Sequence, residues 1–68
     1  MIIYKMNLIE ALKEKGYTTY RIRKEKLLSE ASLTAIRSNK PISWDSIDKI
    51  CTMLDCKIED ILEFKREG

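Results

Sequence analysis

The sequence predicts a compact all-α domain of five short helices, in which the two chain ends could instead form short β-strands. A chain of 68 residues suffices for one small core, so residues 1–68 are expected to form a single domain. Before the last residue, glycine and proline occur only at Gly16 and Pro41. Between these breaks, apolar residues recur at helical spacing behind residues typical of helix N-caps.

Three helices are expected in the first part of the chain, at residues 7–15, 19–26 and 30–38. Each has a residue suited to cap its start, namely Asn7, Thr18 and Ser29. Gly16 stands where the first helix needs a left-handed residue to end. Ile22 and Tyr20 are expected to point inward from the second helix, and Leu33 and Ile36 from the third.

A fourth helix is expected from Trp44 to Leu54, with Ser43 as its cap. It carries a continuous apolar stripe of Ile47, Ile50, Cys51 and Leu54. The segment 58–64 predicts a short fifth helix whose inward residues are Ile58, Ile61 and Leu62. Residues 1–5 and 61–65 also read as strands that could pair as an antiparallel ribbon.

Charge is distributed unevenly along the chain, although the net charge is only +2. Residues 21–40 carry six basic and two acidic side chains, whereas residues 41–68 carry four basic and seven acidic ones. The basic middle is therefore the part that an anionic polymer would approach.

Other classes of protein are not indicated. Cys51 and Cys56 are five residues apart and the chain has no histidine, so we expect small buried thiols in a reducing cytoplasm and no metal or cofactor. No apolar run approaches the roughly 20 residues of a membrane span. Without histidine, a glycine-rich phosphate loop or a framed carboxylate pair, neither catalytic residues nor a small-molecule substrate are expected.

Two short helices joined by a tight turn fit the major groove of B-DNA when the second helix presents small side chains outward. With Leu33 and Ile36 inward, the outward residues are expected to be Glu30, Ala31, Ser32, Thr34, Ala35 and Ser38. None is bulky enough to hold the helix out of a groove about 12 Å wide.

From Asn7 to Leu62 the chain resembles the Cro and phage-repressor (XRE-type) helix-turn-helix domain family, which has a lambda-repressor-like fold. The resemblance lies in "LTAIRSNKPIS" and "IDKICTMLDCKIEDILEF". It implies a cytoplasmic, sequence-specific transcriptional regulator that binds double-stranded DNA as a homodimer and reads the major groove with helix 30–38. By position, the base-contacting residues are Glu30, Ala31, Ser32 and Ala35. The implied phosphate contacts are Thr19, Lys24, Arg37, Lys40 and Ser43.

Alternatives remain for several of these residues. Glu30 could be only an acid in the first turn of a helix, and Arg37 and Lys40 could be ordinary solvated charges. Ala31 and Ala35 give a weakly polar surface that also suits a protein-interaction module on the same fold, such as an antitoxin-like or regulatory subunit.

Two residues depart from the family pattern. Arg23 stands where the family commonly has alanine, and Leu27 stands in the turn where glycine is common. A left-handed leucine costs on the order of 1–2 kcal/mol, so either the turn differs or it is strained. Trp44 is expected to cover the edge of the core, with a dimer contact or a flank against the DNA backbone as alternatives.

Overall fold

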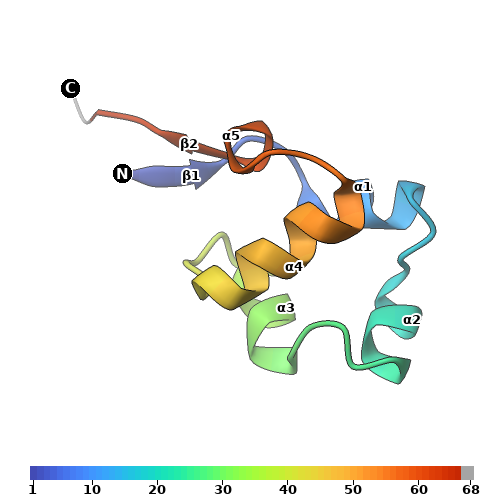
Figure 1. Ribbon diagram of the computed structural model, residues 1–68. Helices are drawn as coiled ribbons and strands as arrows, with labels where there is room; N and C mark the ends of the chain where they lie inside the picture. Colours follow the sequence, from blue (N-terminus) through green and yellow to red (C-terminus); the bar gives the residue numbers. More distant parts are fainter. Residues whose placement is uncertain (67–68) are drawn as a thin grey trace.

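The computed structural model describes residues 1–66 and confirms a helical domain with a small sheet formed by the chain ends (Figure 1). Residues 67–68 of the expected domain lie outside the described part. The elements, in chain order, are β1 (Ile2–Tyr4), α1 (Leu8–Glu14), α2 (Thr19–Lys24), α3 (Glu30–Arg37), α4 (Trp44–Leu54), α5 (Ile58–Ile61) and β2 (Leu62–Phe64). Among residues 1–66, none of these helices has the length and apolar character needed to cross a membrane.

The predicted side-chain caps are confirmed at the starts of α1 to α4. The side-chain oxygen of each cap accepts a hydrogen bond from the backbone N–H three residues later, at 3.1–3.2 Å, and the caps are Asn7, Thr18, Ser29 and Ser43. This bond satisfies an N–H that has no partner within the helix. The sequence therefore determines locally where these helices begin.

The same four helices end in one recurrent turn. Each ends at a left-handed residue: Gly16, Lys26 and Asn39 follow the C-caps of α1 to α3, and Asp55 is itself the C-cap of α4. The next residue donates its backbone N–H to the carbonyl five positions earlier, as Leu27 does to Ile22 at 2.9 Å. This is the Schellman motif, in which the following side chain commonly packs on the helix it ends.

The left-handed residue between α2 and α3 is Lys26, with a φ of 54°, and not Leu27. Leu27 is half-buried against the core, whereas Lys26 is exposed. The turn therefore keeps the leucine inside and puts the backbone strain at a lysine. Because the chain turns at Lys26, α2 ends at Lys24, two residues before the predicted end.

The core lies where α1 packs against α3 and α4. Its buried members are Leu8, Leu12, Ile22, Leu28, Leu33, Ile36, Ile50, Leu54 and Ile61. Leu33 and Ile36 are 1% and 5% exposed, so the predicted anchoring of α3 is confirmed. Cys51 and Cys56 are free thiols and only half-buried, because they lie at the edge of this core.

Two aromatic residues expected to face or cover the core lie on the surface instead. Tyr20 is 73% exposed and Trp44 is 88% exposed. Each precedes a buried helical residue by two positions, namely Ile22 and Ser46. Two positions turn a helix by about 200°, so each aromatic side chain points almost directly away from the core.

The chain ends pair as the predicted antiparallel ribbon, with Ile2 opposite Phe64, Ile3 opposite Glu63 and Tyr4 opposite Leu62. Both strands belong to the same chain. The fifth helix consequently ends at Ile61, short of the predicted residue 64, because the chain becomes extended there. Ile61 is fully buried as expected, but Ile58, which was also expected to point inward, is 53% exposed.

Candidate nucleic-acid interface

The outward face of α3 is open along its whole length. Ser32, Leu33 and Ile36 are buried and define the opposite, inward face. The exposed residues of α3 and its C-cap are Glu30, Ala31, Thr34, Arg37 and Ser38, while Ala35 is half-buried at the edge. With 3.6 residues per turn, Thr34 lies near the middle of the exposed face.

Ser32 does not face outward as predicted. Its exposed fraction is 9%, and its hydroxyl oxygen lies 2.7 Å from that of Ser46 on α4. It also accepts a hydrogen bond from the Ser29 hydroxyl at 3.0 Å. The apolar spacing of α3 predicts that a small polar residue beside Leu33 faces solvent. Ser32 is buried instead because α4 supplies a polar partner for its hydroxyl. Thr34, which was expected to be outward but was not among the predicted base contacts, takes the central position.

A chain of four serine hydroxyls joins the amino ends of α3 and α4. It runs from Ser29 to Ser32, then to Ser46, and ends at Ser43, which donates to Ser46 at 3.1 Å. The two outer serines also cap their helices. No buried side-chain nitrogen or oxygen among residues 1–66 lacks a hydrogen-bond partner. The repeated spacing of two serines three positions apart was the only signal in the sequence for this link.

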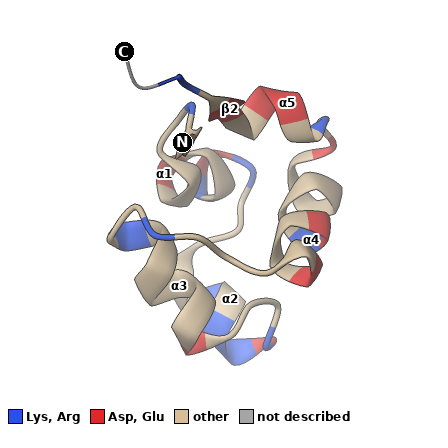
Figure 2. Cartoon of the chain, turned by 90° about the vertical axis from the view of Figure 1, so that its left-hand side faces the viewer, with Lys and Arg blue, Asp and Glu red and all other residues tan. Residues whose placement is uncertain are grey.

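Cationic side chains lie at both ends of the open face of α3. Lys24 and Lys26 come from the end of α2 and the following turn, and Arg37 and Lys40 come from the carboxyl end of α3 and its loop. All four are exposed, and within the described residues none forms a salt bridge. Figure 2 shows basic residues on α2 and beyond α3, whereas acidic residues predominate on α4 and α5.

Arg23, the first departure from the family pattern, forms an ion pair with Glu30 across the turn. The Arg23 Nε and Glu30 Oε1 atoms are 2.7 Å apart, and the two side chains are 47% and 67% exposed. An exposed pair of this kind contributes at most about 1 kcal/mol. Arg23 therefore lies at the surface and does not separate α2 from α3, and the Glu30 carboxylate already has a partner.

Arg21 has a structural role at the start of α2. Its Nε atom lies 2.6 Å from Glu25 Oε2, and this hydrogen-bonded carboxylate raises the pKa of Arg21. The guanidinium group also donates to the Gly16 carbonyl at 3.3 Å and lies 4.8 Å from the centre of the Tyr17 ring. These contacts hold the connection between α1 and α2.

The predicted phosphate contacts do not form one cluster. Thr19 is the half-buried first residue of α2. Lys40 lies beyond the carboxyl end of α3, where its carbonyl accepts the Tyr4 hydroxyl at 2.5 Å. Ser43 caps α4 and lies near the amino end of α3, through the serine chain. Lys40 and Ser43 thus lie toward opposite ends of α3, whereas Thr19 lies at the start of α2.

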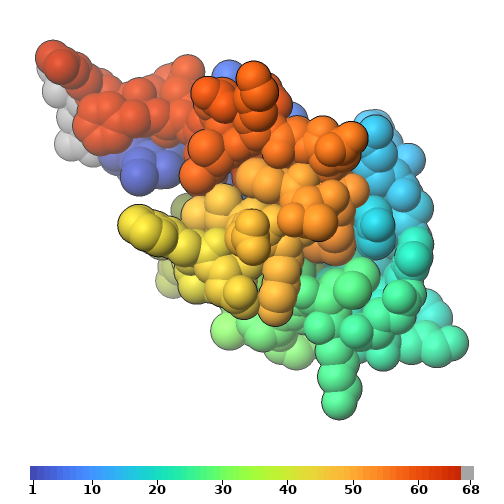
Figure 3. Space-filling view, viewed as in Figure 1, coloured from blue at the N-terminus to red at the C-terminus, as the bar shows by residue number. Residues whose placement is uncertain are grey.

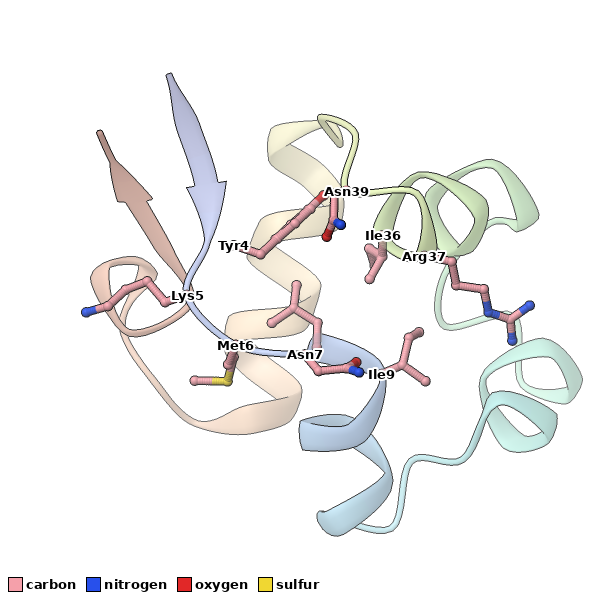
Figure 4. Close-up of a pocket in the computed structure, with 9 residues that line it drawn as sticks. Tyr4, Lys5, Met6, Asn7, Ile9, Ile36, Arg37 and Asn39 are labelled. Atoms are coloured by element: carbon pink, nitrogen blue, oxygen red, sulfur yellow. The ribbon is translucent and has the colours of Figure 1, made fainter. Parts of the chain in front are cut away.

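The hollow shown in Figure 4 lies beside the carboxyl end of α3 and has a volume of about 530 Å³. Lys5 and Arg37 belong to its lining but point away from each other on opposite sides. The Lys5 ammonium group donates to the Glu59 carbonyl at 3.1 Å. The lining residues therefore bring together no acid, base and nucleophile of a catalytic site.

A helix-turn-helix unit with an open second helix and a basic border is characteristic of one class of DNA-binding domain. Residues 7–67 match the Cro/C1-type HTH DNA-binding domain, and the chain belongs to this family. No curated protein and no solved structure matches the chain significantly. The family assignment confirms the resemblance read from the sequence and makes the chain a DNA-binding domain of the kind found in transcriptional regulators.

Proposed function

We propose that the chain is a sequence-specific transcriptional regulator that binds double-stranded DNA as a homodimer, with the outward face of α3 in the major groove. The observation that carries the proposal is the open face of small side chains on α3, with exposed cations at both ends that form no salt bridge within residues 1–66. Small side chains allow the helix to approach base edges, while the cations bind the phosphates on either side.

The proposed base contacts follow from the chemistry of the exposed face. The methyl groups of Ala31 and Ala35 suit apolar contact with thymine methyl groups, and the Thr34 hydroxyl can donate or accept a hydrogen bond. Glu30 can accept from cytosine N4 when its carboxylate turns from Arg23. Ser32 is omitted from the set because its hydroxyl is buried and bonded.

The proposed phosphate contacts are Thr19, Lys24, Arg37, Lys40 and Ser43, and we add Lys26 because it is an exposed cation in the turn before α3. Each cation that neutralises a phosphate releases bound counterions, so affinity should fall steeply with salt concentration. One copy offers few such contacts. Binding as a dimer to two half-sites about 34–36 Å apart would double them.

The proposal is tested by selecting bound duplexes from a random pool and titrating the enriched sequence by fluorescence anisotropy at two salt concentrations. We expect an inverted repeat to be enriched. Arg37→Gln and Lys40→Gln should each weaken binding to all sequences and lower the salt slope of the dimer by about 1.8, since each variant loses one cation from both copies. Lys13→Gln, an exposed cation on α1, is the matched control and should change neither quantity.

Absence of binding to any duplex at low salt would contradict the proposal. Unchanged affinity in the Arg37 and Lys40 variants, together with a stoichiometric protein bound at α3, would favour the alternative of a protein-interaction module. The affinity of an apolar docking surface should hardly change when these two charges are lost, whereas binding to DNA phosphates must weaken.

A further inference from the structure

An apolar surface beside the proposed DNA interface extends from the terminal ribbon to α5. A hollow of about 510 Å³ lies between the ribbon and the loop before α4, and one of about 470 Å³ lies between α4 and α5. Trp44 and Ile47 line both hollows, so the two form one continuous surface. We call it the ribbon-α4 face and define it by Met1, Ile2, Trp44, Ile47, Ile58 and Phe64.

Most large side chains of this face are more than half exposed. The exposed fractions are 88% for Trp44, 69% for Ile2, 67% for Phe64, 60% for Met1 and 53% for Ile58. Single exposed apolar residues are ordinary, but a contiguous apolar patch on a small domain marks an interaction surface. In Figure 3 the start of α4 projects beneath the ribbon, with a hollow between them.

The ribbon itself is incompletely supported by its own chain. Ile2 and Phe64 are cross-strand partners, so their side chains lie on the same face as the half-buried Tyr4 and Leu62. Tyr4 and Leu62 pack on the core, whereas the ribbon extends beyond the helices at its outer end (Figure 1). An isolated two-stranded ribbon is marginally stable in water, so its outer part would be stabilised by further apolar contact.

We propose that the ribbon-α4 face binds a second copy of the chain, with the Trp44 indole of each copy in the ribbon hollow of the other. A two-fold contact requires a surface that is complementary to itself. Here a projecting aromatic side chain and an apolar hollow lie side by side on one face. Exchange between two copies fills both hollows at once and covers both ribbons.

Charges at the border of the ribbon-α4 face favour a second copy of the chain as the binding partner. Lys40 lines the ribbon hollow, while Asp48 lines the hollow on the other side of Trp44, near Asp45 in the first turn of α4. Exchanging Trp44 between copies brings the acidic border of each toward the basic border of the other. The same acidic groups disfavour an anionic lipid surface, which would be repelled from α4.

The exposed apolar side chains of the face supply a large part of the area that a stable dimer needs. A standard interface takes about 800 Å² from each partner, roughly one sixth of the 5157 Å² surface of this chain. Trp44 and Phe64 are large aromatic side chains, which typically bury about 150–250 Å² each, and Ile2, Met1 and Ile58 enlarge the apolar centre. No residue of α3 lines either hollow, although Asn39 and Lys40 in the following loop line the ribbon hollow, so filling the hollows does not cover α3 itself.

The inference rests on the proposed function only for the expectation of a dimer, and its test uses no DNA. Sedimentation equilibrium should show twice the mass of one chain for the wild type at tens of micromolar. Trp44→Glu should raise the dissociation constant about 30-fold or more, as truncation of a central aromatic residue does. Trp44 is exposed and an acid suits the first turn of a helix, so the variant should keep its fold, which circular dichroism checks.

Tyr20→Glu is the matched control, because Tyr20 is another exposed aromatic residue in the first turn of a helix and lies outside the face. It should dimerise like the wild type, whereas Phe64→Thr on the ribbon should weaken the dimer. Trp44 is the only tryptophan, so its fluorescence should shift to the blue and resist acrylamide quenching as wild-type concentration rises.

A wild type that stays monomeric at 100-fold higher concentration overturns the inference, and so does a Trp44→Glu variant that dimerises normally. Stoichiometric capture of a different protein by this face also overturns it. A monomer that still binds duplex DNA would refute the interface and the dimer while leaving DNA binding intact, whereas a Trp44-dependent dimer that binds no DNA would refute the proposed function and leave the interface intact.

Discussion

Replacing Lys26 by glycine should stabilise the domain, although it removes a side chain from the turn of the helix-turn-helix unit. Lys26 has a φ of 54°, where a residue with a Cβ atom costs about 1–2 kcal/mol. Glycine relieves this strain but loses about 0.5–1 kcal/mol through the greater freedom of the unfolded chain. The expected net gain is about 0.5–1 kcal/mol, and the midpoint of thermal unfolding should rise by about 2–8 °C.

Urea and thermal unfolding at one fixed protein concentration measure this effect, since dimerisation would otherwise shift the apparent stability. The matched control is Lys13→Gly, which removes an exposed lysine from inside α1. There glycine gains no relief from strain and should cost about 0.5–1 kcal/mol. A Lys26→Gly variant destabilised as much as this control would show that Lys26 is not left-handed, and the assignment of strain in the turn would be wrong.

Three further predictions concern the serine chain, a thiol and the open face of α3. Ser46→Ala removes the partner of the buried Ser32 hydroxyl and should lower the free energy of unfolding in urea by about 1 kcal/mol. The control Ser38→Ala, at an exposed position, should change it by less than about 0.5 kcal/mol. Burial raises the pKa of the Cys51 thiol, and Cys56 adds to the effect, so the free energy of unfolding should be intact below the ordinary thiol pKa of about 8.5 and fall as the pH rises above it. Cys51→Ala should flatten this decline, and an unchanged decline would show that another group causes it. Thr34→Ala should change the preferred base at one position of each half-site while keeping the salt slope, and an unaltered preference would remove Thr34 from the base contacts.

The starts of α1 to α4 could be predicted because capping is a local interaction. Each cap bonds an N–H only three residues away, so the residue type and the following apolar spacing suffice. The ends were less predictable. A Schellman turn can place its left-handed residue at lysine when the next residue is needed in the core, and the choice between Lys26 and Leu27 depends on packing against distant helices.

The surface positions of Tyr20 and Trp44 could not be read from hydrophobicity. Both are large and apolar, and only the burial of Ile22 and Ser46 two positions later determines which side of the helix they occupy. The burial of a serine in α4 in turn depends on a second serine from α3. Such a pair is a tertiary contact, and a single sequence does not show which polar residues will meet.

The outward residues of α3 were predicted correctly for Glu30, Ala31 and Thr34, because Leu33 and Ile36 fix the helix by periodicity. The sequence did not show that Arg23, one of the two residues that differ from the family pattern, forms an ion pair with Glu30. This ion pair joins α2 to α3. The family match supports DNA binding as a general function, whereas the particular contacts stay predictions.

The structure restrains α3 independently at its two ends, and this matters for how a small domain can hold a reading helix in place. At the amino end, the hydroxyls of Ser32 and Ser46 join α3 to α4. Beyond the carboxyl end, the Tyr4 hydroxyl joins the loop at Lys40 to the terminal ribbon, and burial raises the pKa of Tyr4, so the group stays a neutral donor. Because the ribbon is also part of the proposed dimer contact, a partner that covers Ile2 would support the same strand that positions Lys40. Dimer formation and the placement of a phosphate contact would then depend on one short sheet.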